Sequence, residues 1–252
     1  MRLPSEIDLV PYAAGFPPGQ RWLVLAPHAD DETLGPGATL AQGVDRGIEI
    51  KVVIVTDGAQ QGITATREAE AAAASRALGV GAPDLWRFPD RGLADLLPRL
   101  RVALMRAVEE FSPDTLFVPS PVELHPDHRA VAIAAQCALR RRTRLGLANR
   151  PPRWVAAYEV CSPLQPNLLV AADDGWERKR RAVACYASQL AAGPYERVTE
   201  GLAAVRCLTL PGCGRAEAFH LLPTRSVVRR SARGWAALMG SPLGVTPRRK
   251  RP

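Results

Sequence analysis

The run IEIKVVIVTDG at residues 48–58 constrains the fold more than any other part of the chain. It is rich in β-branched residues, shows no helical periodicity and ends in an Asp-Gly turn. A short apolar run of this kind is typical of a strand that is buried on both faces, as strands are in parallel sheets covered by helices. The run therefore indicates an α/β protein.

Strands and helices alternate along the first half of the sequence. Parallel neighbouring strands need crossover connections, which are most often helical, so the alternation favours a mostly parallel sheet with helices on both faces. With 252 residues, of which 47% are hydrophobic, the chain is long enough for one full core. We expect an α/β protein with a single domain, a Rossmann-like three-layer sandwich with a mostly parallel central sheet. The strands are expected at 21–26, 48–58, 84–90, 115–120 and 154–160, and the helices at 34–47, 66–80, 97–114 and 131–142.

The pattern is weaker in the last third of the chain. Residues 176–190 have the composition of a helix, and residues 204–210, AVRCLTL, resemble a late strand. The C-terminal segment is rich in Arg, Gly, Ser and Pro and ends in PRRKRP. We therefore expect a domain at residues 1–225 and a basic, loosely held tail at residues 226–252 around one short helix.

The chain has a basic balance, with 33 Lys and Arg residues against 25 Asp and Glu residues and a formal net charge of +8. Much of the excess lies in RRRTR at 140–144 and in the tail, and such runs are more often solvated surfaces than binding sites. A nucleic-acid-binding protein that uses the tail is the alternative outside the enzymes. It leaves the polar motifs described below without a role, so we expect no specific nucleic acid partner.

The sequence lacks the signals of membrane insertion and secretion. No stretch approaches the roughly 20 apolar residues that a membrane-spanning helix needs, and the N-terminus lacks the pattern of a secretory signal. The five cysteines are an odd number without a C-x-x-C pair, in a chain large enough to fold without disulfide bonds. We expect a soluble cytoplasmic protein with no transmembrane segment, and the sequence leaves the oligomeric state open.

Two polar motifs follow predicted strands directly. The first, PHADDE at 27–32, places a histidine and three acids before a predicted helix, where the acids could simply cap that helix. The second, ELHPDH at 123–128, contains two of the four histidines of the chain. Ligands of open α/β sheets bind beyond the carboxyl ends of the strands. We therefore expect both motifs, together with polar residues at 56–58 and 88–90, at one edge of the sheet.

Two histidines and one carboxylate can be assembled from the two motifs. Neutral imidazole and carboxylate oxygen are usual ligands of catalytic zinc, which takes three protein ligands and leaves a position for water. Neither motif contains cysteine, which argues against a closed structural zinc site. Because two adjacent aspartates point in different directions, one could face the metal while the other takes a proton from the water that attacks a carbonyl.

These motifs resemble those of the PIG-L or LmbE-like N-acetylglucosaminyl deacetylases, which are A-H-P-D-D-E and, far downstream, H-P-D-H or H-x-x-H. The resemblance covers residues 21–221 and includes TDG at 56–58, FPD at 88–90 and YASQL at 186–190. The chain departs from the family pattern at Ala29, where the family usually has Pro. The resemblance implies a metal-dependent hydrolase that removes an acetyl or other acyl group from the nitrogen of an amino-sugar conjugate.

Matched position by position, the resemblance implies that His28, Asp31 and His128 are the metal ligands and that Asp30 is the general base. Zinc is the expected metal, and a mixed nitrogen and oxygen set also suits Fe²⁺ or Mn²⁺. The resemblance leaves open the length of the acyl group and the group linked to the sugar. Among enzymes, the alternative is a metal-dependent hydrolase of a non-sugar amide or of another bond, because such a site does not reveal which bond it attacks.

The resemblance also implies roles for four further residues. His125 would steady the tetrahedral intermediate or serve as an acid, and Asp127 would orient a histidine beside the metal. Arg67 and Asp90 match positions at which members of the family bind sugar hydroxyls or neighbouring groups.

Overall fold

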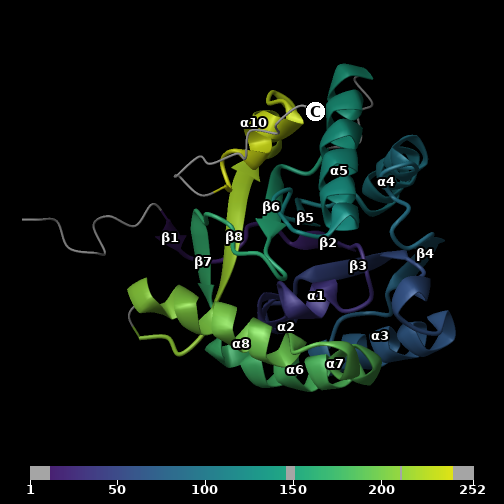
Figure 1. The fold of residues 1–252 in the computed structure, drawn as a ribbon. Helices are drawn as coiled ribbons and strands as arrows, with labels where there is room; N and C mark the ends of the chain where they lie inside the picture. The colour runs from purple at the N-terminus through teal and green to yellow at the C-terminus, as the bar shows by residue number, and fades with distance from the viewer. Residues whose placement is uncertain (1–11, 146–150, 211, 241–252) are drawn as a thin grey trace, which may run out of the picture.

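The computed structural model describes residues 12–145, 151–210 and 212–240 of the chain (Figure 1). Its centre is an eight-stranded sheet with the strand order β1-β7-β8-β6-β5-β2-β3-β4. The strands are β1 (Ala13–Ala14), β2 (Arg21–Ala26), β3 (Glu49–Thr56), β4 (Asp84–Phe88), β5 (Thr115–Pro119), β6 (Trp154–Tyr158), β7 (Leu168–Ala171) and β8 (Ala216–Pro223).

The sheet is mostly parallel. The neighbouring strands β6, β5, β2, β3 and β4 all run in the same direction. β8 is antiparallel to both β6 and β7, and β1 pairs in parallel with β7 at the far edge. These findings confirm the predicted fold class. From β2 the chain moves outward through β3 and β4 and then returns to the other side of β2 as β5, which creates a switch point between β2 and β5.

Helices cover both faces of the sheet. They are α1 (Asp31–Leu34), α2 (Gly37–Asp45), α3 (Thr64–Leu78), α4 (Leu97–Phe111), α5 (Pro126–Leu145), α6 (Asp173–Ala184), α7 (Ala187–Ala192), α8 (Tyr195–Arg206), α9 (Thr224–Val228) and α10 (Ala232–Ala236). α2, α3 and α6 pack on one face, and α4, α5, α9 and α10 lie on the other (Figure 1). The result is the three-layer arrangement expected from the sequence.

The central strands bury side chains on both faces. Leu23 and Leu25 of β2 belong to the core beneath α4 and α5, whereas Trp22 and Val24 belong to the core beneath α2 and α3. All four side chains are fully buried. Successive residues of a strand point to opposite faces, so a strand covered on both sides needs an unbroken apolar run.

Two predicted elements in the last third of the chain differ from the structure. Residues 204–210 are not a strand: they complete α8 and continue as a short 3-10 helix (Cys207–Thr209), and the late strand is β8. A short apolar run does not distinguish a strand from a helix, which explains this error. The single helix predicted at 176–190 is divided into α6 and α7 by Cys185 and Tyr186.

The helix predicted at 131–142 begins earlier, at Pro126. Proline is favoured at the start of a helix, because its missing N–H would have no partner there and its φ already has the helical value. The HPDH motif therefore lies at the N-terminus of α5, a helix of 20 residues, and not in a free loop.

Residues 226–240 of the predicted tail pack against the domain. Val227, Trp235 and Met239 are buried in the core beneath α4 and α5. This segment contains α10 and the end of α9, where the sequence suggested one short helix. Residues 241–252, which include the PRRKR run, lie outside the described residues.

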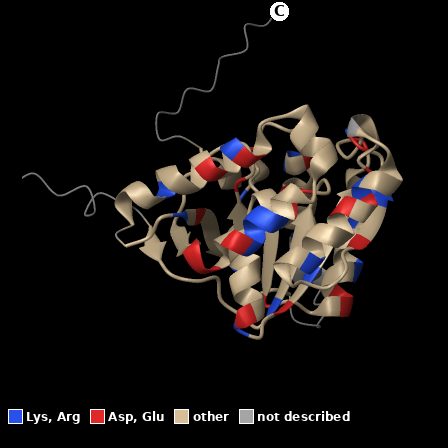
Figure 2. Cartoon of the chain, turned by 90° about the horizontal axis from the view of Figure 1, so that it is seen from below, with Lys and Arg blue, Asp and Glu red and all other residues tan. Residues whose placement is uncertain are grey.

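The described surface carries both signs of charge. Figure 2 shows Lys and Arg residues interspersed with Asp and Glu residues over the helices. None of the helices in the described ranges combines the length and the apolar character that crossing a membrane requires.

Candidate metal centre

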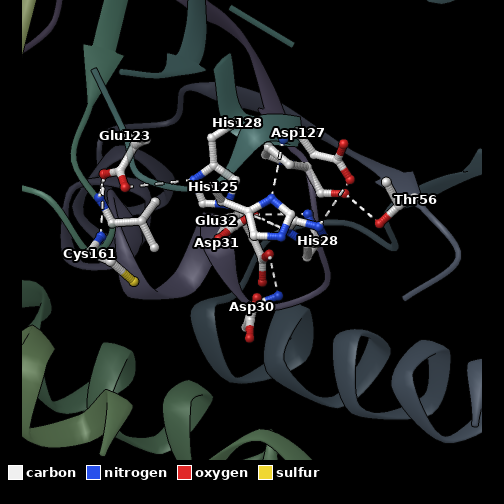
Figure 3. Close-up of polar contacts among 12 residues, drawn as sticks. His28, Asp30, Asp31, Glu32, Thr56, Glu123, His125, Asp127, His128 and Cys161 are labelled. Atoms are coloured by element: carbon white, nitrogen blue, oxygen red, sulfur yellow. Dashed lines mark hydrogen bonds and ion pairs between the residues drawn. The ribbon is translucent and has the colours of Figure 1, made fainter. Parts of the chain in front are cut away.

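The two polar motifs lie beyond the carboxyl ends of β2 and β5, at the switch point of the sheet (Figure 3). Residues 27–32 follow β2, and residues 120–128 lead from β5 into α5. The segments after β3 and β4 reach the same place. The Asp90 N–H donates to Asp57 Oδ1 at 3.2 Å, and Asp90 Oδ1 lies 3.2 Å from His28 Nε2. All four segments therefore meet at one edge of the sheet.

Three potential ligand atoms form a triangle at the centre of this edge. His28 Nδ1 lies 3.3 Å from Asp31 Oδ2 and 3.3 Å from His128 Nε2, and the last two atoms are 3.2 Å apart. Protein ligands bonded to a tetrahedral zinc ion at about 2.0–2.1 Å are about 3.3 Å from one another. The triangle therefore has the dimensions of three metal ligands.

The lone pairs of neutral imidazoles also suit a cation at this point. His28 Nε2 faces the Asp90 carboxylate, and the neutral tautomer that donates to Asp90 carries its lone pair on Nδ1, toward Asp31 and His128. His128 Nδ1 lies 3.8 Å from the Glu123 carboxylate, and the tautomer protonated on that side carries its lone pair on Nε2. Together with the carboxylate oxygen, three lone pairs then point at one another. A divalent metal ion between them would satisfy all three, so the donor set fits such an ion.

Carboxylates on the outer side of His28 hold its ring. Nε2 lies 3.2 Å from Asp90 Oδ1 and 3.5 Å from Asp127 Oδ2. Burial alone would lower the pKa of His28, but hydrogen bonds to Asp127, Asp31 and Asp90 outweigh it and hold this pKa well above its usual value. Outer carboxylates of this kind orient a metal-binding imidazole and make it a stronger ligand. The structure thus places Asp90, which the sequence assigned to substrate, against His28 beside Asp127.

Glu123 is a candidate functional residue that the sequence reasoning missed. It is 1% exposed, and its Oε1 accepts hydrogen bonds from the backbone N–H groups of residues 160–162 at 2.7 to 3.3 Å. Its Oε2 has no hydrogen-bond partner among the described residues and lies 3.8 Å from His128 Nδ1. Glu123 therefore faces the outer side of His128 (Figure 3). The signal in the sequence is its position at the start of the ELHPDH motif.

The backbone separates the roles open to Asp30 and Asp31. Asp30 has a φ of 140°, which residues other than glycine rarely adopt, and its N–H donates to Glu32 Oε2 at 3.2 Å. The Asp31 carboxylate joins the triangle, whereas the Asp30 carboxylate lies 3.7 Å from Arg67 Nη2. Burial, helped by the charge of Asp31, raises the pKa of Asp30 well above its usual value. A raised pKa makes a carboxylate a stronger base, closer in pKa to an effective general base.

His125 lies beside the triangle. Its ring centroid is 4.5 Å from that of His28 and 5.3 Å from that of His128, and nitrogen atoms of the three rings lie within 4.8 Å of one another. His125 is therefore an alternative to Asp31 as the third metal ligand. Its Nδ1, however, already accepts a hydrogen bond from the Asp127 N–H at 3.2 Å. Burial and the charges of the two other histidines lower the pKa of His125, which favours its neutral form.

These groups line a cavity of about 320 Å³, which is large enough for a sugar-sized ligand. Leu124, Tyr195, Arg67 and Arg91 also contribute to its walls. Arg67, expected to bind substrate, is 2% exposed, and its Nη2 donates to the Ala29 carbonyl at 2.6 Å. Arg67 therefore braces the loop that carries the aspartates.

Comparison with known proteins agrees with this geometry. Residues 23–139, which contain both motifs, match the PIG-L family, described as GlcNAc-PI de-N-acetylase. The chain belongs to the PIG-L family.

Relatives of this PIG-L family chain include named deacetylases. Diacetylchitobiose deacetylase of Thermococcus kodakarensis is 27% identical over 66% of this chain and 69% of its own length. The 1D-myo-inositol 2-acetamido-2-deoxy-alpha-D-glucopyranoside deacetylase of Mycobacterium avium is 27% identical over 91% of this chain and 98% of its own length. The crystal structure of the conserved protein TT1542 from Thermus thermophilus is 33% identical and has a TM-score of 0.70, covering 79% of this chain and 93% of that one.

Proposed function

We propose that this PIG-L family chain is a metal-dependent hydrolase that removes an N-acetyl group from an amino-sugar conjugate of the N-acetylglucosamine type. The observation that carries the proposal is the triangle of His28 Nδ1, Asp31 Oδ2 and His128 Nε2, with sides of 3.2 to 3.3 Å at the wall of a cavity. The names of both curated relatives support the reaction, and the second also names an acetamido sugar.

The chain supplies the proton transfers of such a reaction. A divalent metal ion held by His28, Asp31 and His128 would polarise the acyl carbonyl and lower the pKa of water. Asp30 takes the proton of the water that attacks the carbonyl carbon. His125, at the edge of the cavity, stabilises the oxygen of the tetrahedral intermediate and assists departure of the amine.

The proposed metal is zinc, because two imidazoles and one carboxylate form a common catalytic zinc set, and Fe²⁺ and Mn²⁺ suit the same donors. We place the enzyme in the cytoplasm, which the odd number of cysteines without a C-x-x-C pair supports. Its proposed partner is a small-molecule or glycoconjugate substrate.

Acetate release tests the proposal. The purified protein, stripped with a chelator and reconstituted with zinc, is incubated with a panel of N-acetylglucosamine conjugates. We expect stoichiometric acetate and free amine, and no product after chelation. Release of phosphate from phosphorylated sugars without acetate would instead indicate a hydrolase of another bond and would contradict the proposal.

A further inference from the structure

Arg91 has a backbone conformation that is unfavourable for its residue type. Its φ is 62°, in the left-handed region where any residue with a Cβ atom is strained. The next residue, Gly92, would adopt this conformation without strain, but its φ is not positive. Strained residues concentrate at functional sites, and Arg91 lies in the wall of the candidate active-site cavity.

The Asp127 carboxylate, which lies beside the proposed metal ligand His28, holds the backbone at this residue. Asp127 Oδ2 accepts the Arg91 N–H at 2.6 Å, and Asp127 Oδ1 accepts the Leu93 N–H at 3.2 Å. The same carboxylate is fully buried and lies 3.5 Å from His28 Nε2. On the preceding side, Asp90 also contacts His28 Nε2. The backbone of Arg91 is therefore bound on both sides to groups that hold a proposed metal ligand.

Arg91 is one of two arginines that line the cavity. Arg91 is exposed, and within the ranges that the structure describes its side chain has no hydrogen bond or ion pair. The other arginine in the wall, Arg67, is buried, and its Nη2 donates to the Ala29 carbonyl and lies 3.7 Å from Asp30 Oδ2. Its Nε and Nη1 have no hydrogen-bond partner among the described residues. A charged side chain held at the wall by a strained backbone, without a partner among the described residues, is suited to bind a ligand.

The carboxylates in the wall do not neutralise this charge. Asp31 faces the two imidazoles, and Asp90 faces His28 and the Gln60 N–H. Glu123 accepts three backbone N–H groups. Asp30 lies 3.7 Å from Arg67, so within the described residues none of the four acids that line the cavity forms an ion pair with Arg91.

We propose that Arg91 binds an anionic group, a phosphate or a carboxylate, which the substrate carries next to its acylated amino sugar. This inference rests on the proposed function and narrows its substrate class to anionic conjugates. A guanidinium matches both groups, because its parallel N–H donors can bond two oxygens of one phosphate or carboxylate.

The test compares kcat/KM for acetate release from three probes, which are methyl N-acetylglucosaminide, carboxymethyl N-acetylglucosaminide and N-acetylglucosamine 1-phosphate. We expect the native enzyme to prefer at least one anionic probe over the neutral one by about tenfold, the effect of one charged hydrogen-bonded contact. Arg91→Gln should reduce that ratio to near one, mainly through KM, and Arg91→Lys should restore part of it. The preferred anionic probe identifies the group as carboxylate or phosphate.

Two further variants separate charge from backbone strain. Arg91→Gly relieves the left-handed strain, so it should fold at least as well as the native chain while losing the anion preference. Arg87→Gly is the matched control, since Arg87 also has a positive φ of 51° but pairs with Glu68 on α3 and is not part of the cavity wall. Its anion preference should equal that of the native enzyme. An equal rate on all three probes, or a preference that survives in Arg91→Gln, would overturn the inference.

Calorimetric binding of glucosamine 1-phosphate to the zinc-loaded protein distinguishes failure of the inference from failure of the proposed function. If no probe releases acetate, the proposed function fails. The anion site then still stands if Arg91→Gln weakens binding about tenfold, and it fails if the native protein and this variant bind equally. Acetate release without any dependence on Arg91 would leave the proposed function in place and remove the anion site.

Discussion

Asp30 and Asp31 are neighbours in the chain, yet only the Asp31 carboxylate lies within 3.3 Å of both His28 and His128. Asp30 has a φ of 140°, and its carboxylate lies instead 3.7 Å from Arg67. Asp31 thus lies among the proposed metal ligands, whereas Asp30 lies in the cavity wall. This is the arrangement that a metal ligand and a separate general base require.

Asp30→Asn should retain metal and lose turnover. Asparagine tolerates positive φ and has nearly the same shape, so the loop should keep its conformation, whereas the amide cannot accept the proton of the attacking water. We expect kcat to fall by about 10² to 10⁴. Acetate release and metal content are measured together, with Asp95→Asn, an exposed residue outside the cavity wall, as the control. Full activity in Asp30→Asn would exclude Asp30 as the base.

His128→Ala should lose most of the bound zinc, because it removes one corner of the ligand triangle. The measurement is the zinc content of dialysed protein by atomic emission. His220→Ala is the control, because His220 lies on β8 with its Nδ1 2.9 Å from the Gln165 carbonyl, and it is not part of the cavity wall. Equal zinc in the two variants would show that His128 is not a ligand.

Glu123→Gln should weaken metal binding without removing a ligand. The amide oxygen can still accept the N–H groups of residues 160–162, but the negative charge beside His128 is lost. Loss of such an outer partner typically costs about 10- to 100-fold in metal affinity. Competition with a chromogenic chelator measures this affinity, and Glu177→Gln on the surface of α6 is the control. An unchanged metal affinity would mean that Glu123 only holds the backbone of residues 160–162 and does not act on His128.

Lys179→Met should destabilise the fold. Lys179 Nζ donates to Glu217 Oε1 at 2.6 Å and to the carbonyls of Leu34 and Gly35 at 2.8 Å, and both charged side chains are buried. Removing one partner leaves the other charge buried alone, so the free energy of unfolding should fall by about 3–5 kcal/mol.

The double variant Lys179→Met with Glu217→Leu should lose less stability than the single variant, because no unpaired charge remains. Urea denaturation followed by circular dichroism measures both differences. A double variant that is less stable than Lys179→Met alone would contradict this explanation and would point to the hydrogen bonds that Glu217 accepts from Ala38 and Thr39 at the start of α2.

Local patterns were sufficient to predict the framework of the molecule. The apolar runs at 21–26 and 48–58 predicted buried parallel strands, and the structure has β2 and β3 there. The polar motifs after the strands predicted a shared edge, because parallel strands present their carboxyl ends together. The same reasoning failed at 204–210, where the short apolar run fits a helix as well as a strand.

The sequence by itself therefore determined the α/β class, the edge of the sheet at which polar groups gather and the residue types available there. Only the tertiary structure decided their pairing: Asp90 meets His28 across 62 residues of chain, and Glu123 rather than a nearer acid faces His128. Such contacts depend on the strand order and on single backbone angles, such as the φ of 140° at Asp30. Neither leaves a local pattern in the sequence, because both are fixed by packing between segments that are distant in the chain.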